Sequence, residues 1–228
     1  MRNSAIQAAK QTGNDYQRIK KLWFRIMQKY KCWRQRKSTS INYEINMSKS
    51  TKYKLDNFFS SFGAAVNLSD KAKRGKHYFE LVCIFANIID GLLRLTLIMK
   101  EQLDSNSDIV NEKLLFQDDD DKKIMERTIY TNALNKKIIT KAVYEKLNKL
   151  YDRRNKIIHR YIISDIKTLG VLDAAKKYDL MLSVITERHR KIHNELVAQN
   201  LGLAKMFIEN PSAEQMKKQI MRKHKGLF

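Results

Sequence analysis

The strongest periodic pattern in the chain lies in residues 171–200, which read VLDAAKKYDLMLSVITERHRKIHNELVAQN. Seven apolar or aromatic side chains and one histidine recur there in alternating steps of four and three positions. These residues are Val171, Ala175, Tyr178, Leu182, Ile185, His189, Ile192 and Leu196. Such spacing makes one continuous face on an α-helix, suited to packing within a bundle or against a second subunit. The stretch therefore predicts one long helix of a helical fold.

Upstream, residues 77–103 predict a second long helix. Its inner face carries Phe79, Cys83, Ala86, Ile89, Leu93 and Leu97. The most hydrophobic window, residues 81–99, also contains Asp90 and Arg94. Since a charged side chain costs about 3 kcal/mol at the centre of a bilayer, we expect a core helix here and not a membrane span. A shorter helix is predicted for residues 140–153, from the spacing of Val143, Leu147, Leu150 and Tyr151.

The composition favours an all-α protein. Only 7 Gly and 1 Pro occur among the 228 residues, and a chain poor in both favours long helices. The two cysteines, Cys32 and Cys83, lie far apart and predict neither a disulfide framework nor a zinc site, so we expect a reducing cytoplasm. The N-terminus lacks the apolar stretch of a signal peptide.

The formal net charge of +21 predicts a polyanionic partner, of which nucleic acid is the usual example. Residues 1–40 contain eleven Lys or Arg and one acid. Within them, residues 15–36 predict a basic amphipathic helix whose apolar side is formed by Tyr16, Ile19, Trp23, Ile26, Met27, Tyr30 and Trp33. The tryptophans suit two roles, stacking on bases or docking on the rest of the chain. A membrane surface would also attract this helix.

Three parts of the chain follow from these patterns. We expect a basic helix and linker over residues 1–65, a helical bundle over 66–205 and a basic tail over 206–228. The linker is the polar stretch 36–54, and Asn67, Ser69 and Asp70 are candidate N-caps after the boundary. A polar insert, residues 105–123, contains four consecutive aspartates at 118–121. Because neighbouring carboxylates diverge, a solvated loop is a better interpretation than a metal site.

The residues that suit chemistry lie in 151–161, YDRRNKIIHRY. The imidazole of His159 can take the proton of a ribose 2′-hydroxyl near neutral pH. The guanidinium of Arg154 can bind the scissile phosphate through two parallel hydrogen bonds. Together they permit RNA cleavage to a 2′,3′-cyclic phosphate without a metal or cofactor. Five positions on an ideal helix turn by about 140°, so the pair converges only if the helix breaks near Asn155 or if two subunits each contribute.

This pattern resembles the Arg-x4–6-His-x-Tyr signature of the HEPN superfamily, and the resemblance covers roughly residues 66–205. It implies an up-and-down bundle of four to five helices, a homodimer with a composite cleft, and metal-independent endoribonuclease activity in toxin–antitoxin or phage-defence systems. It implies that Arg154 binds phosphate, that His159 is catalytic and that Asn155 is the polar residue following the arginine. It also matches Tyr161 to a tyrosine that a nucleotidyltransferase antitoxin adenylylates. The alternative for Tyr161 is simple aromatic packing.

Asp90 lies in the middle of the apolar stretch 81–99, where an isolated carboxylate is costly. Two interpretations are open. The carboxylate orients His159 or Arg154, or it pairs with a core arginine such as Arg94.

The cations Arg153, Lys156 and Arg160 flank the pair and are candidates for binding neighbouring RNA phosphates, although solubility explains them equally well. Residues 188–193 repeat the Arg-x4-His spacing but lack the Asn and the x-Tyr ending, and we interpret them as a chance match.

The predicted function is therefore a metal-independent endoribonuclease that acts on tRNA or mRNA. The alternative is an inactive helical scaffold or nucleic-acid-binding module. A membrane-surface protein is the third hypothesis.

Overall fold

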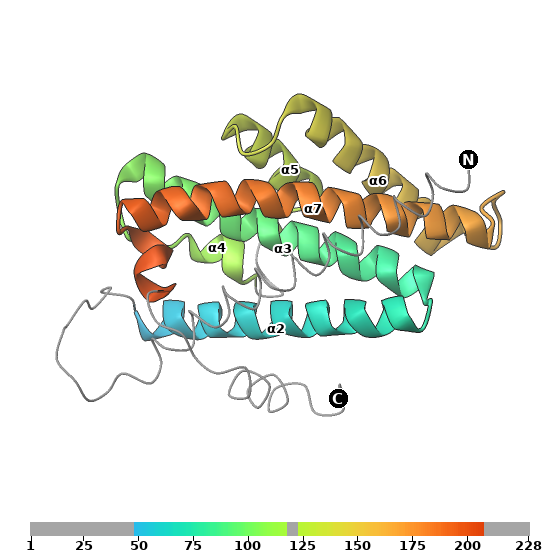
Figure 1. The fold of residues 1–228 in the computed structure, drawn as a ribbon, viewed down its shortest axis with the longest axis horizontal. Coiled ribbons are helices and arrows are strands. Elements are labelled where there is room, and N and C mark those ends of the chain that lie inside the picture. The colour runs from blue at the N-terminus through green and yellow to red at the C-terminus, as the bar shows by residue number, and fades with distance from the viewer. Residues whose placement is uncertain (1–47, 118–122, 208–228) are drawn as a thin grey trace, which may run out of the picture.

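The computed structural model describes residues 48–117 and 123–207, which form six α-helices and one 3-10 helix (Figure 1). They are α2 (Lys49–Arg74), α3 (Tyr78–Ser105), α4 (Glu112–Leu115), α5 (Glu126–Asn135), α6 (Lys141–Arg160), α7 (Thr168–Ala198) and η1 (Gly202–Phe207). These described residues contain no β-strand, so the all-α prediction is confirmed. The predicted helix 15–36, the aspartates 118–121 and all of the tail beyond residue 207 lie outside the described residues.

Helix α3 is the centre of the bundle, because it contacts α2, α4, α5, α6, α7 and η1. It runs beside α7 in the same direction and antiparallel to α2, while α5 and α6 lie on the other side of the bundle from α2 (Figure 1). Its apolar side chains Val82, Ile89, Leu93 and Ile98 are fully buried. Packing on several sides explains why the sequence of α3 is apolar over so much of its circumference.

Among the described residues, α3 is also the one helix long and apolar enough to cross a membrane by length and composition. In this structure, 67% of its most apolar window is buried inside the bundle.

The predicted apolar face of residues 171–200 is confirmed. All eight of its residues, from Val171 to Leu196, are buried in α7. Helix α7 makes its most extensive contact with α3. This face is therefore used within the bundle.

The expected boundary at residue 66 falls inside α2, which runs through it from Lys49 to Arg74. Ser48 caps this helix by accepting a hydrogen bond from the Thr51 amide at 3.0 Å. Ser69, a predicted cap, is buried inside α2 and donates its hydroxyl to the Val66 carbonyl at 2.7 Å. The sequence did not indicate this helix because polar residues lie between the apolar residues of its inner face. Those apolar residues are Leu55, Phe59, Phe62 and Val66.

Other expectations need smaller corrections. The helix predicted to end at residue 153 continues to Arg160, and the polar insert holds α4, whose Leu114 and Leu115 are buried. Phe79, expected on the inner face of α3, is exposed. Its ring packs edge-on against the Tyr161 ring, with the two ring centres 4.6 Å apart.

A buried amide joins the end of α3 to η1. The Gln102 side chain accepts a hydrogen bond from the Leu203 amide at 3.0 Å and donates to the carbonyls of Asp108 and Ile109, each at 3.2 Å. Gly202 has a positive φ of 54°, and a Cβ there would collide with Gln102. Glycine is therefore required at this turn.

Candidate active site

Arg154 and His159 lie in one unbroken helix, α6, which ends at Arg160. The helix break that sequence analysis allowed near Asn155 does not occur. Since five helical positions turn by about 140°, the two side chains leave α6 in different directions. One protomer therefore does not bring the guanidinium and the imidazole together.

Arg154 points into the bundle, where its side chain is 14% exposed and forms an ion pair with Glu126 of α5. Its Nε and Nη2 donate to the Asn155 side-chain oxygen at 3.3 and 3.1 Å. Its guanidinium also lies 4.7 Å from the ring centre of Tyr151, a cation–π contact. Three contacts therefore fix the arginine in place.

A second layer of polar groups surrounds this pair. The Tyr130 hydroxyl donates to the other oxygen of Glu126, and both burial and the Glu126 charge raise the pKa of Tyr130. Burial also raises the pKa of Tyr178, whose hydroxyl has no hydrogen-bond partner among the described residues. For Arg154 itself, burial lowers the pKa but the hydrogen bond and charge of Glu126 outweigh it, so the pKa is raised. The arginine stays charged.

Asp90 lies near this network but pairs with Arg94, whose Nε donates to it at 2.7 Å. Arg94 is held in turn by the Ile124 carbonyl, at 2.9 Å from its Nη2. Burial raises the pKa of Asp90, and Arg94 opposes that shift. The structure therefore has the pairing with Arg94, which was one of the two interpretations of Asp90.

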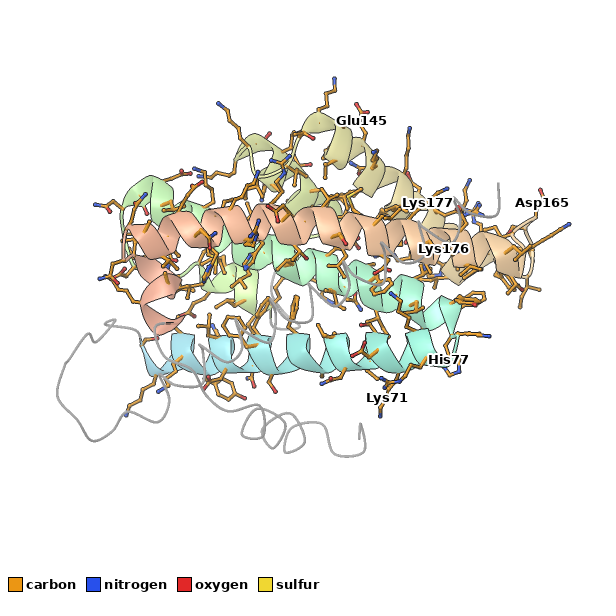
Figure 2. The ribbon with its side chains drawn as sticks, in the orientation of Figure 1. Lys71, His77, Glu145, Asp165, Lys176 and Lys177 are labelled. Atoms are coloured by element: carbon orange, nitrogen blue, oxygen red, sulfur yellow. The ribbon has the colours of Figure 1, made fainter. Side chains whose placement is uncertain are left out.

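His159 has the opposite setting, in the last turn of α6 with its side chain exposed. Lys156 and Arg160 are exposed as well, whereas Arg153 is half-buried near Gly170. The turn between α6 and α7, which contains Asp165, forms one end of the molecule (Figure 2). The predicted catalytic histidine is therefore accessible from solvent at the end of the bundle.

Tyr161 follows α6 directly and is half-buried. Its ring contacts Phe79, and its hydroxyl lies 3.1 Å from the Thr168 hydroxyl at the start of α7. Its hydroxyl hydrogen bond is on the surface. This tyrosine therefore both packs and presents its oxygen to solvent.

Apolar side chains are unusually exposed around His159. Ile162 is 96% exposed and Ile163 81%, and Ile158 and Leu169 are exposed beside them in sequence. We call these four residues the apolar tip. The four residues lie within twelve positions of one another in the sequence, from the end of α6 to the start of α7.

Sequence reasoning missed the partners of Arg154. Glu126 lies 28 positions before the arginine. No periodic pattern links the two.

The chance motif at 188–193 contains a second buried group, His189. Its Nδ1 lies 2.9 Å from the Thr96 hydroxyl oxygen. In residues 48–117 and 123–207, no group of three or more His, Cys, Asp or Glu is arranged to hold a metal ion.

Comparisons with protein-family models, with curated proteins and with solved structures found no match to this chain.

Proposed function

We propose that this protein is a metal-independent endoribonuclease of the HEPN type that acts as a homodimer, with His159 as the general base. The observation that carries the proposal is the position of His159. It is exposed at the end of the bundle, between Lys156 and Arg160 and next to the apolar tip. An exposed imidazole among cations suits a backbone of phosphates and ribose hydroxyls.

The reaction needs a cation on the phosphate as well as a base. His159 removes the proton of the 2′-hydroxyl, whose oxygen attacks the adjacent phosphorus, and the 5′-oxygen of the next nucleotide leaves. Arg154 uses three of its N–H groups on Glu126 and Asn155. Because a guanidinium carries about five N–H donors, two remain for a phosphate oxygen. That phosphate would lie beside the His159 of the second subunit.

The apolar tip supports the homodimer. Its two most exposed residues, Ile162 and Ile163, follow the motif directly, so a second copy that covers them would meet the first copy beside His159. A twofold interface of this kind would use the same surface on both copies.

A cytoplasmic toxin–antitoxin or phage-defence pair is the proposed setting, with tRNA or mRNA as the target. Tyr161 is the proposed site of silencing by a nucleotidyltransferase antitoxin, because its hydroxyl lies at the surface. Adding AMP there would bring negative charge and bulk beside the phosphate site.

The direct test compares cleavage of total RNA in EDTA by the wild type, by His159→Ala and by the control His77→Ala. His77 is another exposed histidine and lies outside the motif. We expect His159→Ala to lower the rate by about 10²–10⁴-fold, the usual contribution of an acid–base group, and His77→Ala to leave it unchanged. The products should end in 2′,3′-cyclic phosphate. Equal rates for the wild type and His159→Ala would overturn the proposal.

The homodimer has a sharper test, in which His159→Ala and Arg154→Lys subunits are mixed. If each site takes its arginine and its histidine from different subunits, the mixed dimers regain one intact site. The mixture should then recover about a quarter of the wild-type rate, from half of the dimers with half of their sites. No recovery, with mixed dimers demonstrated by mass, contradicts the shared site.

A second candidate is a charge-driven nucleic-acid-binding bundle without catalysis. It is favoured by the unbroken α6 and by the Glu126 carboxylate, which occupies the guanidinium of Arg154. In that case RNA binding would weaken steeply with salt, and His159→Ala would change it no more than Lys156→Ala.

A further inference from the structure

A groove with a volume of about 600 Å³ lies between α2, α3 and α4, away from the apolar tip. Its wall on α2 follows one helical face from Tyr53 to Ala65. At about 1.5 Å per residue, this wall is about 18 Å long. The other lining residues are Asn87, Ile88 and Gly91 of α3 and Leu115 and Phe116 at α4.

Aromatic rings make the groove apolar. Phe58 and Phe62 line it with their rings 6.2 Å apart, and Tyr53 stands at one end, 65% exposed. Gly91 forms the floor, where a Cβ would come within 3.0 Å of the Phe62 ring. The glycine therefore lets this ring lie directly against the backbone of α3, which deepens the groove.

We propose that residues 15–36 of the same chain dock in this groove as an amphipathic helix. Long apolar grooves between helices bind such helices through side chains spaced at three and four positions. The apolar series of this segment, from Tyr16 to Trp33, has that spacing and contains both tryptophans of the chain. Large aromatic side chains are the usual anchors of such contacts.

The tether is short enough to favour this occupant over a separate molecule. Residues 37–47 join the segment to Ser48, which caps α2 and so lies next to the Tyr53 end of the groove. Eleven extended residues reach at most about 36–40 Å, which is twice the length of the groove wall. A tether of this length holds its segment at an effective concentration on the order of 1 mM.

The tryptophans allow a direct test on the full chain, because Trp23 and Trp33 are the 2 tryptophans of the protein. The measurement is tryptophan emission with acrylamide quenching. We expect the wild type to show blue-shifted emission and several-fold weaker quenching than the same chain in urea. The groove variants are Tyr53→Asp alone and with Phe116→Asp, both at exposed side chains so that the fold survives. Each should shift emission to the red and raise quenching several-fold.

The matched control is Ile162→Asp with Leu169→Asp, which makes the same chemical change on exposed residues of the apolar tip. It should leave emission and quenching unchanged. Wild-type tryptophans as accessible as in urea would overturn the proposal. So would protection that disappears on dilution, which means docking on a second copy, or protection that appears only with RNA, which means base stacking. Equal quenching of the wild type and both groove variants would also overturn it.

Discussion

The two sides of α6 place similar side chains in opposite surroundings. On the inner side, Arg154 is fixed by Glu126, Asn155 and Tyr151 in a nearly closed network. On the outer side, His159 and Arg160 are exposed at the end of the same helix. Burial makes the ion pair of Arg154 costly to break, while His159 and Arg160 lie where a ligand can reach them. One helix therefore carries both a guanidinium that is held in place and an imidazole that is accessible from solvent.

The strongest test of the inner side is Glu126→Ala. It leaves the Arg154 guanidinium without its carboxylate at a position where both side chains are 14% exposed. Breaking one partner of a buried pair costs about 3–5 kcal/mol, so urea unfolding should show a loss of that size. The matched control is Asp152→Ala. Asp152 pairs with Arg127, whose guanidinium also lies over the Tyr151 ring, but the side chains of this pair are exposed, Arg127 at 49% and Asp152 at 60%. An exposed pair is worth about 0–1 kcal/mol, and equal losses for the two variants would contradict the comparison.

The second test uses acid on another buried group, His189. Burial, with a smaller contribution from His193, lowers the pKa of His189 from 6.5 to about 3. Between pH 6.5 and pH 3, His189 is therefore protonated in the unfolded chain but not in the folded chain. The free energy of unfolding falls as the pH is lowered from 6.5 towards 3. The expected slope from this group is about 1.4 kcal/mol per pH unit. Urea unfolding at several pH values should show a smaller slope for His189→Leu than for the wild type. Identical slopes would mean that the histidine is protonated in the fold.

The smallest effect on stability is expected at the apolar tip. Ile162→Asp with Ile163→Asp changes two side chains that are 96% and 81% exposed, so the free energy of unfolding of the protomer should move by about 0.5 kcal/mol or less. The same variant should shift the sedimentation coefficient from dimer to monomer across a concentration series. A wild-type protein that is monomeric at every concentration would contradict the proposed role of the apolar tip in forming the homodimer.

The long helices were predictable because their apolar period is sustained. Residues 77–103 and 171–200 hold that pattern for many turns, and they correspond to α3 and α7. Helices α2 and α5 escaped prediction for a physical reason. Lysines, serines and asparagines lie between the apolar residues of the inner face of α2. The burial of that face depends on its packing against α3.

The candidate site was predictable in part. The spacing of Arg154 and His159 left two ways to bring them together, a break in the helix near Asn155 or a second subunit, and the unbroken α6 excludes the first. Which charge would hold the arginine was not predictable, since Glu126 comes from α5, a helix that the sequence did not reveal. Tertiary contacts select such partners, and a single sequence carries no period for them.

The length of α7 has a consequence for how a pair of these molecules would behave in solution. At about 1.5 Å per residue its 31 residues extend about 46 Å, and its first turn lies beside the apolar tip. Two copies joined there end to end, with their α7 helices in line, would form a rod nearly twice as long as one. Such a rod would tumble slowly end over end, and small-angle scattering would distinguish its extended profile from that of two copies lying flank to flank.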